Sequence, residues 1–294
     1  MIRHFESRLG PVEFSDEGPD SSIDKPAGDP VVLFHGFTGA KDSWIDLRRE
    51  LRPRYRVIAV DLPGHGGTAF GSALTNYSLE AAAAMVKSAL VECAKLNRFA
   101  VVGYSMGGRL ALFFALQYAA LVSKLVLESA SPGIAEPRER QQRRESDCEL
   151  ADSIETAGVE AFVNRWERIP LFESLSQLPS DERARLRSQR MKCSAQGLAR
   201  SLRGMGVGAQ PWLGDRLQEL TMPVLVVAGE LDRKYAEIAR AMAARIPHGR
   251  LEVVGGAGHL VHLENSNAFN RLVADFLELR AHTDQIHRRV SNAD

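Results

Sequence analysis

The pentapeptide Gly103-Tyr104-Ser105-Met106-Gly107 constrains the fold of this 294-residue chain more than any other feature. It follows a short apolar run, Phe99 to Val102, and opens an amphipathic stretch from Gly107 to Ala120. A serine between glycines at a strand-to-helix junction is typical of a nucleophile elbow, a sharp turn that exposes the serine hydroxyl. The alternative is a serine that only caps the helix. We favour the elbow, because an acid and a histidine follow later in the chain in the order that such a site requires.

Short apolar runs alternate with amphipathic stretches along much of the chain. Runs of this length, rich in β-branched residues, are typical of parallel strands buried on both faces, and the amphipathic stretches are typical of helices. The sequence therefore predicts an α/β-hydrolase fold, with a mostly parallel sheet flanked by helices. The predicted strands are Val31–Phe34, Val57–Val60, Ala100–Val102, Leu125–Leu127 and Val224–Val227, and the predicted helices are Leu79–Leu96, Gly107–Ala120, Glu237–Ala244 and Ala268–Leu279.

The alternation stops between residues 131 and 220, where charged helical sequence replaces strand signals. We interpret this segment as a helical cap inserted after the sixth strand of a core formed by residues 1–130 and 221–281. Asp16–Asp29 is rich in Ser, Asp, Gly and Pro and predicts a loop between an N-terminal strand and the first core strand. The polar residues 282–294 predict a disordered tail.

Composition excludes several classes of function. The 37 basic residues balance the 37 acidic ones, so no charge bias points to nucleic acid. Cys93, Cys148 and Cys193 lack ligand or disulfide spacing, and no nucleotide-binding motif occurs, which predicts neither metal nor cofactor. The N-terminus has no long apolar run, so we expect no secretory signal, no membrane span and a cytoplasmic location. The oligomeric state leaves no signal in the sequence.

A serine hydroxyl needs an imidazole to take its proton, and that imidazole needs a carboxylate to hold its tautomer. His259 follows a strand-like segment and a loop of small residues that would let its ring reach Ser105. His262 is its competitor, although we expect it to be a surface histidine. Asp232 follows a predicted strand, at the carboxyl edge where open α/β sheets place their sites, and Glu128 is the alternative acid.

Two further segments follow predicted strands. His35-Gly36-Phe37-Thr38-Gly39 matches a loop that supplies one backbone donor to an oxyanion hole, and the residue after the elbow serine supplies the other. We therefore assign the oxyanion hole to the main-chain N–H groups of Phe37 and Met106. Asp61-Leu62-Pro63-Gly64-His65-Gly66 is interpreted as turn chemistry that shapes a loop, and not as a catalytic element.

The cap segment holds many arginines and nearly as many acidic residues, so most of these arginines must be solvated or paired. Two or three are expected to face the pocket. Arg109 stands one helical turn beyond Ser105, near the site. Because guanidinium groups grip carboxylates with paired hydrogen bonds, this pattern favours a small polycarboxylate substrate. Trp166 is either an aromatic wall of the pocket or ordinary core of the cap.

The chain resembles the 2-succinyl-6-hydroxy-2,4-cyclohexadiene-1-carboxylate synthases of menaquinone and phylloquinone biosynthesis. The similarity runs from about Val31 to Phe276 and includes the cap. It is carried by Gly103-Tyr104-Ser105-Met106-Gly107-Gly108-Arg109, Glu128-Ser129-Ala130-Ser131-Pro132-Gly133, Trp166 with Pro170-Leu171-Phe172, Leu186-Arg187-Ser188 and Gly229-Glu230-Leu231-Asp232-Arg233-Lys234-Tyr235.

The resemblance implies a lyase that eliminates pyruvate from 2-succinyl-5-enolpyruvyl-6-hydroxy-3-cyclohexene-1-carboxylate without metal or organic cofactor. Ser105 would be the general base, worked by His259 and Asp232, and no acyl-enzyme would form. By family correspondence the substrate is bound by Tyr104 and Arg109 near the elbow and by Arg143, Trp166 and Arg187 from the cap, with Arg140 and Arg144 as competitors of Arg143.

Two other function classes are alternatives on the same fold. A carboxylesterase, thioesterase or carbon–carbon bond hydrolase would employ the triad with water as the second nucleophile. A non-catalytic ligand-binding relative would not need an intact triad, so the sequence argues against it.

Overall fold

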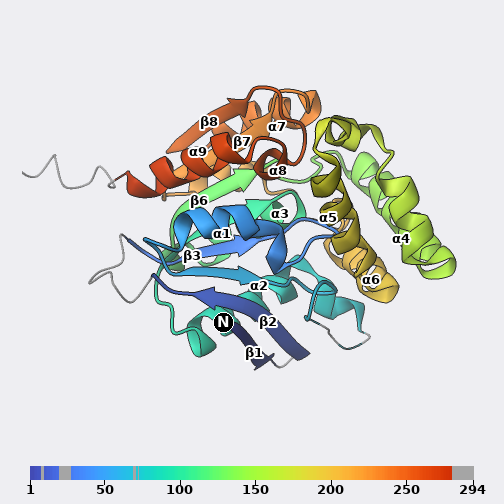
Figure 1. Ribbon diagram of the computed structural model, residues 1–294, viewed down its shortest axis with the longest axis horizontal. Coiled ribbons are helices and arrows are strands. Elements are labelled where there is room, and N and C mark those ends of the chain that lie inside the picture. Colours follow the sequence, from blue (N-terminus) through green and yellow to red (C-terminus); the bar gives the residue numbers. More distant parts are fainter. Residues whose placement is uncertain (8–9, 20–27, 69–70, 72, 280–294) are drawn as a thin grey trace, which may run out of the picture.

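The computed structural model describes residues 1–7, 10–19, 28–68, 71 and 73–279. Their core is an eight-stranded sheet with the order β1-β2-β4-β3-β5-β6-β7-β8 (Figure 1). β1 and β2 pair antiparallel, β2 also runs antiparallel to β4, and the remaining neighbours are parallel. The strands are β1 (Ile2–Ser7), β2 (Gly10–Glu17), β3 (Val31–Phe34), β4 (Val57–Val60), β5 (Phe99–Tyr104), β6 (Val122–Glu128), β7 (Val224–Gly229) and β8 (Gly249–Val254).

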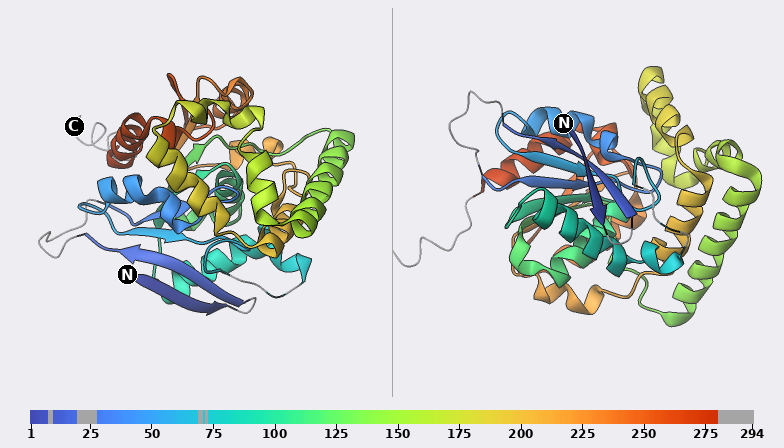
Figure 2. Two further views of the ribbon diagram at one scale, coloured as in Figure 1. Left: turned by 45° about the vertical axis from the view of Figure 1, so that its right-hand side comes forward. Right: turned by 90° about the horizontal axis from the view of Figure 1, so that it is seen from below.

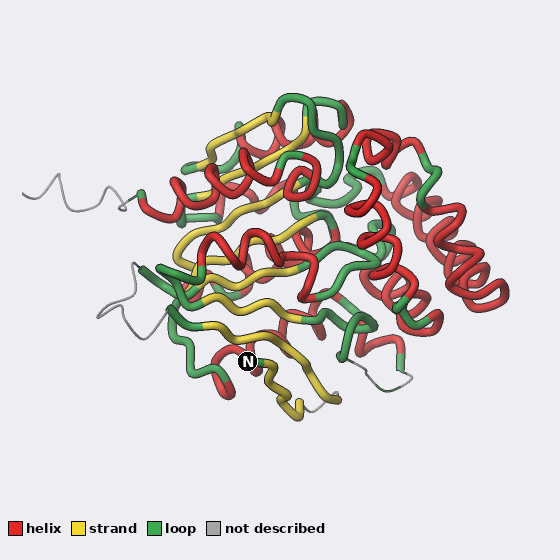
Figure 3. Tube along the Cα trace, in the orientation of Figure 1, coloured by secondary structure: helices red, strands yellow, loops and turns green. Residues whose placement is uncertain are grey.

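Helices cover both faces of the sheet, as the tube in Figure 3 shows. Val32 and Phe34 of β3 pack in one apolar cluster with α2 (Leu79–Ser88), α3 (Met106–Gln117) and α7 (Arg233–Ala243). Val31 and Leu33 point to the opposite face and its second cluster. Because successive side chains of a strand alternate between faces, an all-apolar strand such as β3 must be covered twice. The second face is covered by α1 (Ile45–Leu51), α8 (Val261–Glu264) and α9 (Ser266–Glu278).

Three helices form a separate group beyond the carboxyl ends of the parallel strands (Figures 1 and 2). They are α4 (Pro137–Trp166), α5 (Ser180–Met191) and α6 (Ala195–Met205). α4 is bent at Gly158, which has a φ of 80°. Ile154 and Phe162 of α4 share an apolar cluster with Leu198 of α6, and Phe37 of the core packs against it. We propose that residues 131–220 act as a cap on the core, and this division of the chain stays a prediction.

The strand predictions agree closely with the structure in the core and differ at the N-terminus. β3 and β4 have the predicted bounds, and β5, β6 and β7 extend beyond them. The single predicted N-terminal strand is instead a hairpin, and β2 continues to Glu17, into the segment predicted as a loop. Val12 and Phe14 of β2 are buried against the core, which explains why this segment joins the sheet. The predicted tail and most of the predicted loop lie outside the described residues.

Within the described ranges, no helix combines the length and the apolar character needed to cross a membrane.

The cap helix α6 approaches the core so closely that backbone meets backbone at two glycines. A methyl group on Gly197 would lie 2.3 Å from the carbonyl oxygen of Gly64, and one on Gly204 would lie 2.4 Å from the carbonyl oxygen of Tyr77. Only glycine allows two backbones to approach this closely. The seam therefore fixes α6 against the loop that follows β4.

We expect the Gly197→Ala substitution to lower the free energy of unfolding by about 1–3 kcal/mol, because the added methyl overpacks the seam. Urea denaturation measures this change. Gly18→Ala is the control, because a methyl there meets nothing within 4 Å. Equal stability of both variants would show that the seam is not tight.

Candidate active site

Ser105 occupies a strained turn between β5 and α3. Its φ of 50° and ψ of −109° lie outside the regions that L-residues normally adopt. The turn requires close contact between α3 and the sheet, because a methyl on Gly107 would lie 2.2 Å from the carbonyl oxygen of Phe34. A methyl on Gly103 would lie 2.5 Å from the carbonyl oxygen of Gly107. The two glycines of the pentapeptide thus permit the elbow geometry.

His259 joins Ser105 to Asp232. Its Nε2 lies 3.0 Å from Ser105 Oγ, and its Nδ1 lies 2.6 Å from Asp232 Oδ2. Because a carboxylate can only accept, Nδ1 carries the proton and Nε2 is free to accept the serine proton. Asp232 Oδ1 also accepts the backbone N–H of Tyr235, which fixes the carboxylate at the start of α7. The structure brings the three predicted side chains together, and their catalytic role stays a prediction.

Glu128 and His262, the alternatives to Asp232 and His259, pair with each other. Glu128 at the end of β6 accepts the Nδ1–H of His262 at 2.8 Å and its backbone N–H at 2.9 Å. The expectation that His262 lies at the surface is wrong: the residue is 8% exposed, because α8 turns it inward against Trp44 and Tyr104. The pair fixes α8 through His262, which stands three residues after His259.

The predicted oxyanion donors lie beside the serine. Within the described part of the chain, no protein acceptor occupies the backbone N–H of Phe37 or of Met106. A methyl on Gly36 would lie 3.5 Å from Ser105 Cβ, so the peptide that carries the Phe37 N–H passes close to the elbow. Gly36, Phe37 and Tyr104 all line a cavity of about 680 Å³.

Arg109 lies on α3 where the spacing predicts. Its Nη1 donates to the carbonyl oxygen of Met205 at 2.7 Å and to Gln210 Oε1 at 3.1 Å. Burial lowers the pKa of this guanidinium to about 10. Among the described residues it forms no ion pair, so a buried positive charge has only neutral protein partners.

Of the three predicted cap residues, Trp166 packs among aromatic rings, whereas Arg143 and Arg187 form ion pairs with carboxylates of the cap. Trp166 packs against Phe37 and Phe172, with ring centroids 5.6 and 5.4 Å apart. The half-exposed Arg143 donates through Nε to Asp147 Oδ1 at 2.7 Å.

Arg187 is 39% exposed and binds Glu167 and Asn164. It does not line the cavity that holds Tyr104. The competitor Arg140 donates to the carbonyl oxygen of Ile134, and Arg144 is exposed.

Arg190 is the cap arginine that sequence reasoning missed. It is 2% exposed, lines the 680 Å³ cavity with Tyr104, and stands 5.0 Å over the ring of Phe172. Its Nε has no partner among the described residues, and Glu167 is 3.4 Å from its Nη1. Burial lowers the pKa of its guanidinium. The signal was the four-residue spacing of Leu186 and Arg190, which puts the arginine on the same face of α5 as an apolar residue that lines the cavity.

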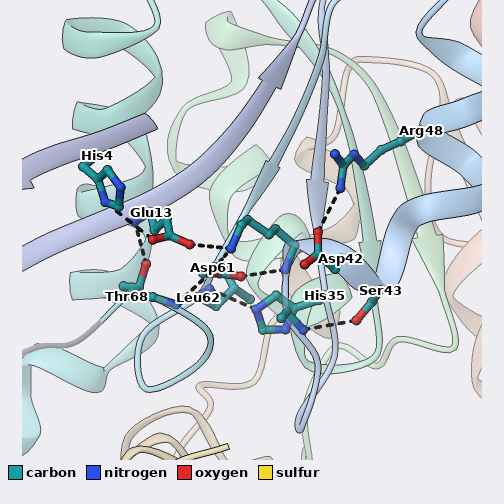
Figure 4. A network of polar contacts seen from close by, with 12 residues as sticks. His4, Glu13, His35, Asp42, Ser43, Arg48, Asp61, Leu62 and Thr68 are labelled. Carbon is teal, nitrogen blue, oxygen red and sulfur yellow. Dashed lines mark hydrogen bonds and ion pairs between the residues drawn. The ribbon is translucent and has the colours of Figure 1, made fainter. Parts of the chain in front are cut away.

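The loops after β3 and β4 are cross-linked by a buried polar network (Figure 4). Lys41 contacts Glu13 and Asp61 through Nζ, and its backbone N–H donates to Asp61 Oδ1 at 2.6 Å. The ion pairs raise the pKa of the ammonium against the opposing effect of burial. His35 Nε2 accepts the backbone N–H of Leu62 at 3.0 Å. The network holds the predicted oxyanion loop against the loop 61–68.

His35 and His65 are both buried and neutral. Burial lowers the pKa of His35 to about 4 and that of His65 to about 3. In the described part of the chain, no cluster of His, Cys, Asp or Glu is arranged to bind a metal ion.

Fold and site together define an α/β-hydrolase-fold protein whose elbow serine meets a histidine–aspartate pair. Residues 29–266 match the family model of the alpha/beta hydrolase fold, which confirms the predicted fold class. The chain is 32% identical to 2-succinyl-6-hydroxy-2,4-cyclohexadiene-1-carboxylate synthase of Enterobacter sp., over 87% of this chain and 94% of that protein. It is 43% identical to a Bacillus subtilis protein assigned to the same synthase, over 90% and 93% of the two chains.

The same family appears among solved structures. A structure of MenH from S. aureus superposes with a TM-score of 0.85 at 33% identity, covering 90% of this chain and 97% of that one. The chain belongs to the 2-succinyl-6-hydroxy-2,4-cyclohexadiene-1-carboxylate synthase family, as the sequence resemblance predicted.

The lowered pKa values of His35 and His65 predict a pH dependence of stability. Unfolded histidines titrate near 6.5, so the unfolded chain takes up protons that the folded chain excludes. The stabilisation is complete above pH 6.5 and is lost as the pH falls toward about 4 and about 3. In urea titrations, the stability gap between wild type and His65→Gln should shrink as the pH falls from 7.5 to 4.5. His248→Gln, at an exposed position, is the control. A gap independent of pH would contradict the prediction.

Proposed function

We propose that this protein is a lyase that eliminates pyruvate from 2-succinyl-5-enolpyruvyl-6-hydroxy-3-cyclohexene-1-carboxylate and forms 2-succinyl-6-hydroxy-2,4-cyclohexadiene-1-carboxylate. The observation that carries the proposal is the 3.0 Å contact between His259 Nε2 and Ser105 Oγ, in a chain of the synthase family. The buried arginines near the elbow support the same substrate. The reaction breaks a carbon–oxygen bond and consumes no water.

The triad supplies the base. His259 accepts the hydroxyl proton of Ser105, and Asp232 stabilises the resulting imidazolium. Ser105 Oγ then takes the proton from the carbon beside the succinyl carbonyl, and the N–H groups of Phe37 and Met106 bind the enolate oxygen. As the electrons move through the ring, the carbon–oxygen bond to the enolpyruvyl group breaks. The imidazolium proton neutralises the departing enolate, which becomes pyruvate.

Buried guanidinium groups select the substrate. Arg109 and Arg190 are 7% and 2% exposed, and their desolvated charges have few protein partners. A substrate carboxylate would supply the missing charge and accept charge-assisted hydrogen bonds. We therefore propose a small polycarboxylate substrate, with Arg190 rather than Arg187 as the α5 contact. Tyr104 lines the same cavity and contributes its hydroxyl.

The free cysteines Cys93, Cys148 and Cys193 suit a reducing compartment, so we place the reaction in the cytoplasm.

The purified protein should release pyruvate from the enolpyruvyl substrate, followed by coupling to lactate dehydrogenase. Ser105→Ala should lower kcat by about 1000-fold or more, because the base is lost while the fold is kept. Simple aryl esters serve as the comparison. Rapid ester turnover with no pyruvate release would replace the lyase by a hydrolase.

Arg190→Met should raise KM for the substrate by about 10- to 100-fold, because one charge-assisted hydrogen bond contributes about 1.5–3 kcal/mol. Methionine keeps the apolar stem against Phe172 and removes the charge. Arg187→Met on the same helix is the matched control and should change KM by less than about threefold. The reverse order would return the substrate contact to Arg187.

A further inference from the structure

The peptide that joins Gly36 to Phe37 carries the proposed oxyanion donor, and hydrogen bonds to its carbonyl oxygen hold it in place. The carbonyl of Gly36 and the N–H of Phe37 belong to one trans peptide, so they point in opposite directions. Gly36 O accepts the Nδ1–H of His35 at 2.7 Å and the backbone N–H of Gly39 at 3.0 Å. These two bonds fix the rotation of the peptide plane and therefore the direction of the Phe37 N–H.

The next peptide is held by a second imidazole. Thr38 N–H donates to His65 Nε2 at 3.3 Å, and the Nδ1–H of His65 donates to the carbonyl oxygen of Pro63 at 3.1 Å. Thr38 is 4% exposed and has a φ of 67°, a left-handed conformation that strains a β-branched residue by about 1–3 kcal/mol. Such a turn persists only when its surroundings determine it. The carbonyl of Thr38 also faces Cys193 Sγ at 3.6 Å.

The tautomer of each ring is dictated by its partners. For His35, a carbonyl faces Nδ1 and an N–H faces Nε2. His65 has the same arrangement. An N–H cannot donate to a protonated nitrogen, so both rings must be neutral with the proton on Nδ1. Donation into the Gly36 carbonyl also polarises that amide and strengthens its N–H as a donor.

We propose that His35 and His65 are positioning residues of the reaction, which hold the two peptide planes on either side of Phe37 so that its N–H meets the enolate oxygen. The inference rests on the proposed function, because it concerns the same oxyanion hole. It gives a chemical role to His65, in a segment that the sequence indicates only as a turn. Neither ring contacts substrate.

Asparagine and glutamine substitutions separate the two ring nitrogens. An asparagine amide can reproduce the Nδ1–H donor, whereas a glutamine carbonyl can reproduce the Nε2 acceptor. At position 35 the donor to Gly36 matters for catalysis, so kcat should stay near wild type in His35→Asn and fall about 10- to 100-fold in His35→Gln. At position 65 the acceptor from Thr38 matters, so His65→Gln should stay active and His65→Asn should lose about 10- to 100-fold. KM should change by less than about threefold in all four variants.

If His35 and His65 only stabilise the two loops, the expected result is different. At position 35 it would depend on the cross-loop bond to Leu62, so His35→Gln would be the better variant. Either that order, or equal losses at both positions, would overturn the proposal. Absence of pyruvate release by the wild type would instead contradict the proposed function.

The tautomers of His35 and His65 can be measured in the wild-type protein, so this test needs neither an activity assay nor correctly folded variants. Long-range ¹H–¹⁵N NMR spectra distinguish the two neutral histidine tautomers. We expect both His35 and His65 as the Nδ1–H form at pH 7. At position 35 the Nε2–H form would remove the bond to Gly36, and at position 65 either the Nε2–H form or a charged ring would remove the bond from Thr38. Any of these results would overturn the proposal.

Discussion

The close approach of α3 to the sheet at Gly103 and Gly107 is the constraint on which the rest of the site depends. Without a side chain at either position, the helix starts directly beneath the carbonyl of Phe34. The chain can then turn through the strained Ser105 and present the hydroxyl above the sheet. That strain is maintained because β5 and α3 are both buried and cannot relax. His259 and Asp232 need only reach this one point from the loops that follow β8 and β7.

In the proposed function, the cap helices add positive charge and its polar partners to the site. α5 brings Arg190 over Phe172, and the C-terminal end of α6 brings the carbonyl of Met205 to Arg109. Desolvating a guanidinium is costly when it has no carboxylate partner, as for Arg109, or only a long contact, as for Arg190 with Glu167 at 3.4 Å. A protein retains such a group where a ligand can pair with it. The same seam of glycines that fixes α6 to the core also fixes Met205. The proposed substrate selection is thereby tied to the docking of α6 on the core.

The polar network between the loops after β3 and β4 differs from Arg109 and Arg190 in its electrostatics. Its charges are paired inside the protein, as Lys41 with Asp61, and its two imidazoles are neutral. A fully satisfied buried network gives rigidity and a single arrangement. In this protein that rigidity lies next to the N–H of Phe37, the proposed oxyanion donor, whose position matters most while charge develops on the substrate.

The sequence by itself determined the α/β class, the bounds of β3 and β4, and the order of serine, acid and histidine. These follow from local rules: apolar runs, glycines at a turn, and polar residues at strand ends. Only the tertiary structure decided that His262 is buried against Glu128, that the N-terminus is a hairpin, and that Arg190 rather than Arg187 lines the cavity. A sequence fixes the periodicity of a helix, but it does not fix how the helix is rotated about its axis against its neighbours. Arg187 and Arg190 are three residues apart on α5, and the rotation of this helix decides which of them lines the cavity.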